Sequence, residues 1–177
     1  MRFERTVKRL TITAPRTSLV ILLLLLIFAG CEKTPQAINL PIPDGADRAL
    51  RESPQLTLFS LDPGDDKGGP GPRLQGSRIL GETLLSPEDR RRVTEALRHD
   101  ISHWNYDMAL CFYPRHAIRA TNNGTNYDFL ICYECSNLEV FDPSHNYPTV
   151  IGITGSGKVF NEVLRAANIP ISTPPAK

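Results

Sequence analysis

Hydrophobic and polar positions follow two periods along this chain, and the periods separate predicted strands from predicted helices. Short apolar segments that end at Pro, Gly, Asn or Asp are typical of strands. We expect strands over 56–61, 77–85, 107–113, 116–121, 127–132 and 138–141, with 147–153 as a further candidate. The Asn-Gly pair at 123–124 predicts a hairpin between the fourth and fifth of these.

Two segments carry apolar residues at helical spacing. Ser86-Pro87-Glu88-Asp89 is a helix start, with Ser86 as N-cap, Pro87 at the first helical position and two acids near the positive end of the helix dipole. That helix should run to about His103, and a shorter one should cover 159–167. This order of elements predicts an α+β fold, in which one mostly antiparallel sheet has two helices packed on one face.

The N-terminal region has the pattern of a signal peptide. A basic segment precedes an apolar run over 19–29, which is shorter than the about 20 residues that a membrane span needs. Phe28-Ala29-Gly30-Cys31 resembles the lipobox of bacterial lipoproteins. The resemblance implies cleavage after Gly30 and lipidation of Cys31 with palmitate-type chains, which anchor a protein stably when two or more are present. It also implies a domain held at the cell membrane or outer membrane and facing the periplasm or the exterior.

The remaining chain divides by composition. Residues 1–30 are the predicted signal peptide, and residues 31–54, rich in proline, are a predicted extended tether. Residues 55–171 are long enough for a single domain with its own core, and residues 172–177 are a predicted disordered tail.

Charge argues against one class of partner. From residue 31 onward the chain has 15 Lys and Arg against 18 Asp and Glu. A mildly acidic domain lacks the basic surface by which proteins bind nucleic acid, so we expect no nucleic-acid partner.

Cys111, His116, Cys132 and Cys135 form a dense cluster of reactive residue types in the pattern C-x4-H-x15-C-x2-C. Three interpretations stay open. The four side chains could be ligands of a structural zinc ion. Cys132 and Cys135 could be a thiol redox pair, or two of the three thiols could form a structural disulfide.

The expected hairpin register bears on these interpretations. With a three-residue loop over 123–125, His116 and Cys132 pair and share one face of the sheet, while Cys111 and Cys135 share the other. Any joint role of the C-x2-C pair needs a turn between its cysteines, because a straight strand would point their sulfurs to opposite faces.

The residues around the cluster resemble a family. The segments CFYPRHAIR (111–119) and LICYEC (130–135) are similar to a group of uncharacterised bacterial proteins, many of them predicted lipoproteins, with the core C-F-x-P-[RH]-H and I-C-[FY]-x-C. The resemblance covers about residues 55–170 and implies a single domain. It implies no activity.

Gly152-x4-Gly157-Lys158 matches most of a phosphate-binding loop, but Val159 stands where Ser or Thr would hold magnesium, so we interpret the segment as a glycine turn that begins a helix.

The sequence shows no set of residues with the spacing of a known catalytic motif. The sequence therefore favours a non-enzymatic, lipid-anchored envelope protein that binds another envelope protein or is structural. The alternatives are a zinc-binding domain and a thiol redox protein.

Overall fold

The computed structural model describes residues 39–64, 69–105 and 107–173. The predicted signal peptide and the predicted lipidation site Cys31 lie outside the described residues, as does most of the predicted tail. No helix in the described part combines the length and the apolar character that a membrane crossing requires.

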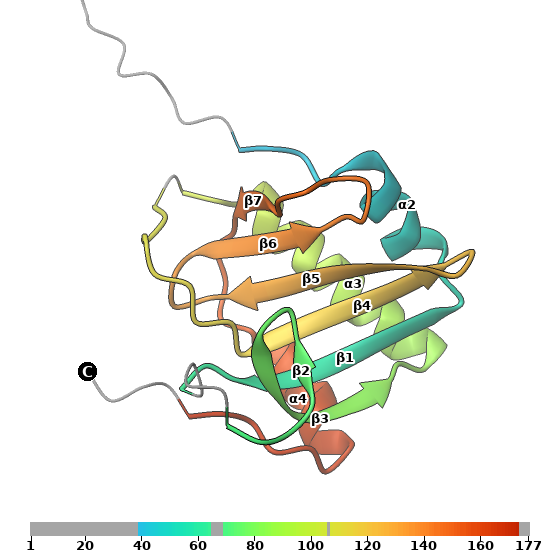
Figure 1. Cartoon of the computed structure of the whole chain (residues 1–177), viewed down its shortest axis with the longest axis vertical. Coiled ribbons are helices and arrows are strands. Elements are labelled where there is room, and N and C mark those ends of the chain that lie inside the picture. The colour runs from blue at the N-terminus through green and yellow to red at the C-terminus, as the bar shows by residue number, and fades with distance from the viewer. Residues whose placement is uncertain (1–38, 65–68, 106, 174–177) are drawn as a thin grey trace, which may run out of the picture. The chain divides into compact units, whose positions relative to one another are not determined.

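Within the described residues, the fold is a single antiparallel sheet with helices on one face, which confirms the predicted α+β class (Figure 1). The sheet order is β2-β3-β1-β4-β5-β6-β7. The strands are β1 (Gln55–Asp62), β2 (Arg73–Leu74), β3 (Ser77–Leu84), β4 (His116–Asn122), β5 (Thr125–Cys132), β6 (Asn137–Phe141) and β7 (Thr149–Gly152). The helices are α2 (Asp44–Glu52), α3 (Pro87–Ser102) and α4 (Lys158–Ala166).

Helix α2 is a correction to the predicted tether over 31–54. Residues 44–52 are not extended but helical. Ala46, Ala49 and Leu50 are buried against the same core as α3 and α4, so three helices rather than two cover this face. Burial of one stripe of a short helix stabilises it in place, because isolated helices of this length are marginal in water.

The two faces of the sheet have separate apolar clusters, because successive side chains of a strand point to opposite faces. The helix face contains the larger cluster, to which β4 and β5 contribute Ile118, Ala120, Phe129 and Ile131. The opposite face contains a smaller cluster of Phe59, Leu61, Leu74, Ala117 and Leu130. In Figure 1 helices α3 and α4 lie behind the sheet, and β2 with its connections lies in front of it.

Helix α3 begins as the sequence predicts. Ser86 is the N-cap, and its Oγ accepts a hydrogen bond of 3.1 Å from the backbone N–H of Asp89. Val93 and Leu97 are the fully buried positions of the helix. The cap satisfies one backbone donor that the first helical turn would otherwise leave unpaired.

The hairpin between β4 and β5 forms where Asn-Gly predicts it, but the expected register is wrong by one residue. The loop has two residues, Asn123 and Gly124, both at positive φ, and not three. His116 therefore pairs with Ile131 and not with Cys132. A shift of one residue moves a side chain to the other face of a sheet. His116 thus lies on the helix face, whereas Cys132 lies on the opposite face.

The segment 107–115 is not a strand, contrary to the sequence expectation. It has no regular secondary structure, and in Figure 1 it lies at the end of the sheet where β5 stops, before the chain enters β4. Leu110 and Phe112, as apolar neighbours of the hairpin, are expected to be buried; Leu110 is fully exposed, and Phe112 is partly buried against the smaller cluster. The other predicted core residues of this region, Ile118, Phe129 and Ile131, are completely buried as expected.

Candidate functional site

A tight turn after β5 brings the two cysteines of the C-x2-C pair together. Residues 133–136 form the turn, in which the Ser136 N–H donates to the Tyr133 carbonyl over 3.2 Å and Ser136 adopts positive φ. Cys132 and Cys135 are joined by a disulfide, and both are completely buried. The turn on which a joint role of this pair depends is therefore present.

Cys111 supplies a third sulfur at this disulfide. Its Sγ lies 3.6 Å from the Sγ of Cys135. Among the described cysteines it is the one thiol outside a disulfide, and it is exposed to solvent. An exposed thiol thus touches a disulfide that solvent does not reach.

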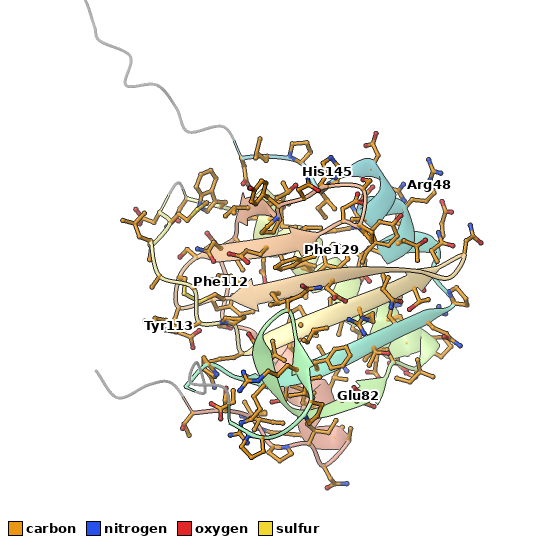
Figure 2. All side chains as sticks on the ribbon, viewed as in Figure 1. Arg48, Glu82, Phe112, Tyr113, Phe129 and His145 are labelled. Carbon is orange, nitrogen blue, oxygen red and sulfur yellow. A yellow bond between two sulfur atoms is a disulfide. The ribbon has the colours of Figure 1, made fainter. Side chains whose placement is uncertain are left out.

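Backbone hydrogen bonds hold the segment of Cys111 against the turn. The Ala109 N–H donates to the Cys135 carbonyl over 2.9 Å, and the Asn137 side-chain amide donates to the Ala109 carbonyl over 3.3 Å. Figure 2 labels Phe112 and Tyr113 at the end of the sheet where β5 stops and β6 begins. These contacts fix the sulfur positions through the backbone and not only through side-chain packing.

The sulfur of Cys135 has a further polar contact. The Tyr113 backbone N–H donates to Cys135 Sγ over 3.4 Å. Such a donor would stabilise negative charge on this sulfur whenever the disulfide opens, because a hydrogen bond to the charged form of a group favours that form. The contact therefore distinguishes Cys135 from Cys132, for which no such donor lies in the described part of the chain.

His116 lies away from the three sulfurs. Its ring is buried on the helix face, where Nε2 is 2.9 Å from Asn161 Oδ1 on α4 and the ring packs near Phe160 and Tyr133. Nδ1 is buried and has no hydrogen-bond partner among the described residues. Burial lowers the pKa of His116 to about 4, since the interior disfavours the imidazolium.

A second polar contact joins α3 to the turn after β5. The Tyr133 hydroxyl donates to Asp100 Oδ2 over 2.7 Å, and burial together with this carboxylate raises the pKa of Tyr133. The sequence analysis did not single out Asp100 or Asn161. The sequence signal for Asn161 is a polar residue directly beside Phe160, a buried position of α4.

The glycine-rich segment before α4 is a turn that begins a helix, as predicted. Gly157 is the N-cap residue and has positive φ. Gly152 ends β7 and lies so close to the indole of Trp104 that a Cβ there would come within 2.2 Å of it. The close approach is sufficient reason for glycine at that position without a phosphate ligand.

The four candidate zinc ligands do not converge on one point. The three sulfurs lie together, but His116 is on the other face of the sheet and hydrogen-bonds to Asn161. In the part of the chain that the structure describes, no group of three or more His, Cys, Asp or Glu side chains is arranged to hold a metal ion. The physical reason is the alternation of side chains along paired strands: His116 pairs with Ile131, so its ring faces the helices, whereas Cys132 points to the other face.

The site and the fold together define an α+β domain with a buried disulfide and an adjacent exposed thiol. No known protein family, curated protein or solved structure matches the chain in comparisons of sequence and fold. The similarity to uncharacterised bacterial proteins therefore stays a prediction from the sequence.

Proposed function

We propose that this protein is a lipid-anchored envelope protein that exchanges disulfides with thiols, with Cys132 and Cys135 as the buried redox pair and Cys111 as the sulfur that contacts other molecules. The observation that carries the proposal is the distance of 3.6 Å between the sulfurs of Cys111 and Cys135. Reacting atoms about 3–3.5 Å apart are close to the geometry of attack. The lipobox of the sequence supports an oxidising compartment, where disulfides persist.

The internal step moves the disulfide outward. The Cys111 thiolate attacks Cys135 Sγ, the Cys132–Cys135 bond breaks, and its electron pair remains on Cys132. The product is a Cys111–Cys135 disulfide with one sulfur exposed and a thiolate at Cys132. Because Cys132 is completely buried, its thiolate is disfavoured, and the resting state is the Cys132–Cys135 disulfide.

The external step uses a partner dithiol. A partner thiolate attacks Cys111 Sγ and displaces Cys135, whose negative charge the Tyr113 N–H stabilises. The second partner thiolate then attacks the partner's own sulfur and releases Cys111. The partner becomes a disulfide, the Cys132–Cys135 pair becomes two thiols, and two protons pass from the partner to these sulfurs. The reverse sequence reduces a partner disulfide, and the difference in reduction potential between the two couples sets the direction.

The test compares the reduction rate of the buried disulfide with and without Cys111. Excess dithiothreitol is added to the oxidised mature domain and to its Cys111→Ser variant, and the new thiols are trapped by alkylation and located by mass spectrometry. Because direct access to Cys132 and Cys135 is blocked by burial, we expect the variant to be reduced at least about tenfold more slowly, which is a barrier difference of about 1.4 kcal/mol.

A second variant checks the internal pairing. Cys132→Ser should accumulate a Cys111–Cys135 disulfide under mild oxidation, because these two sulfurs are already in contact. Equal reduction rates in the wild type and Cys111→Ser, together with no Cys111–Cys135 bond, would show that the disulfide is a structural cross-link. The domain would then be a binding or structural module without exchange activity.

A further inference from the structure

The surface around Cys111 is apolar. Met108, Leu110 and Tyr113 are all exposed, and Leu110 makes no burying contact at all. Together with the thiol they form a surface that we call the thiol surface, defined as residues 108–113. All six residues of this surface are apolar or sulfur-bearing, and five of them are exposed to solvent, where burial of an apolar side chain contributes nothing.

The backbone of the thiol surface also has N–H and C=O groups that can form hydrogen bonds with another molecule. Among the hydrogen bonds of the described residues, Ala109 donates to the Cys135 carbonyl and Tyr113 donates to Cys135 Sγ, whereas the peptide groups of 110–112 have no partner. The neighbouring strand offers no ladder position, because β5 already pairs with β4 and β6. Cys111 and its two neighbours therefore present backbone N–H and C=O groups that a bound polypeptide could hydrogen-bond.

We infer that the partner of Cys111 is a cysteine within a polypeptide segment that has apolar neighbours, and not a small thiol such as glutathione. This inference rests on the proposed exchange function. A polypeptide can use both features at once: its backbone hydrogen-bonds to residues 110–112, and its apolar side chains cover Leu110 and Met108. Glutathione, a charged tripeptide, would leave these apolar side chains exposed. Its reaction rate with Cys111 should therefore not depend on Leu110 or Met108.

The experiment uses the reduced mature domain and three disulfide probes. The first is a short peptide dimer joined through a cysteine flanked by leucines, the second is the same dimer with serines in place of the leucines, and the third is glutathione disulfide. Acid quenching and mass spectrometry give the rate constant for each. We expect the leucine probe to react about tenfold faster than the serine probe, because covering a leucine side chain is favourable by more than 1 kcal/mol.

The variant Leu110→Ser should remove most of the preference for the leucine probe and change the glutathione rate by less than about twofold. Leu84→Ser is the matched control, because Leu84 is a similarly exposed leucine on β3 and should affect neither rate. Since both leucines are exposed, neither substitution should disturb folding.

The outcomes separate the two proposals. Equal wild-type rates with the leucine and serine probes, or equal effects of the two leucine variants, would overturn the polypeptide inference and leave Cys111 reacting with small disulfides. Rates that do not depend on Cys111 would overturn the exchange function itself, and with it this inference.

Discussion

His116 is a buried imidazole: one ring nitrogen is hydrogen-bonded to Asn161, and the other has no hydrogen-bond partner in the described part of the chain. Its pKa falls from 6.5 to about 4, mainly because burial disfavours the charged form. Between these two pH values the unfolded chain binds the proton and the folded protein does not. The free energy of unfolding therefore rises with pH across this window and is lost as the pH falls through it.

We predict that the folded domain loses about 3 kcal/mol of stability from this group between pH 7 and pH 4, the free-energy equivalent of the pKa difference. Urea unfolding at several pH values measures it. His116→Gln, which keeps an amide donor for Asn161 and does not titrate, should show a shallower pH dependence by this amount. Identical pH dependence in the two proteins would mean that the histidine is hydrated in the folded state.

At this scale the sequence predicts the residue types of the site but not their arrangement. The cluster Cys111, Cys132 and Cys135 does assemble, and the turn after Cys132 follows from the need to join a C-x2-C pair. The sequence expectation separates His116 from Cys111 and Cys135 correctly but pairs it with Cys132, because it assumes a three-residue loop, whereas Asn-Gly forms the two-residue loop that this dipeptide favours. One residue of difference there decides which face His116 occupies.

Helix α2 was not predicted, because the composition of its segment is that of a linker. Its apolar positions Ala46, Ala49 and Leu50 have helical spacing, but prolines on both sides and a short length give it the composition of a linker. Segment 107–115 is the opposite case. Its short apolar run, which ends at Pro114, predicts a strand, but β5 already pairs with β4 and β6, so no strand edge is left beside it.

We predict that Leu50→Ala destabilises the domain by about 2–5 kcal/mol, the usual cost of truncating a buried leucine. Leu50 is 2% exposed and packs in the core of the helix face. Arg48→Ala, on the exposed side of the same helix as Figure 2 shows, is the control and should change stability by less than about 0.5 kcal/mol. Urea unfolding followed by circular dichroism compares them. Equal, small effects would mean that residues 44–52 do not belong to the folded domain.

At the scale of the whole molecule, the proposed location at the membrane depends on lipidation of Cys31. We predict that radiolabelled palmitate enters the wild-type protein and the Cys111→Ser variant but not Cys31→Ser, which should move from the membrane fraction to the soluble fraction. Two or three acyl chains give stable membrane binding, whereas a protein without them has no anchor. Label retained in Cys31→Ser would remove the basis for an envelope location.

The inclusion of α2 in the domain shortens any such tether. Asn39, the first described residue, is eight residues beyond Cys31, and eight residues span at most about 29 Å when fully extended. A lipid on Cys31 would therefore lie no farther than about 29 Å along the chain from Asn39.

Asn39 has one more consequence, at the outer edge of the sheet. Its side-chain amide accepts a hydrogen bond from the Gly152 N–H over 2.7 Å and donates to the Gly152 carbonyl over 2.9 Å, as a residue of a neighbouring strand would do. An open strand edge is a template on which a second chain can pair and aggregate. By occupying both backbone groups of Gly152, this single amide closes part of the edge of β7, a strand of only four residues, to another copy of the protein. Copies crowded side by side would thus meet at an edge that is already partly hydrogen-bonded, which favours separate molecules over a continuous intermolecular sheet.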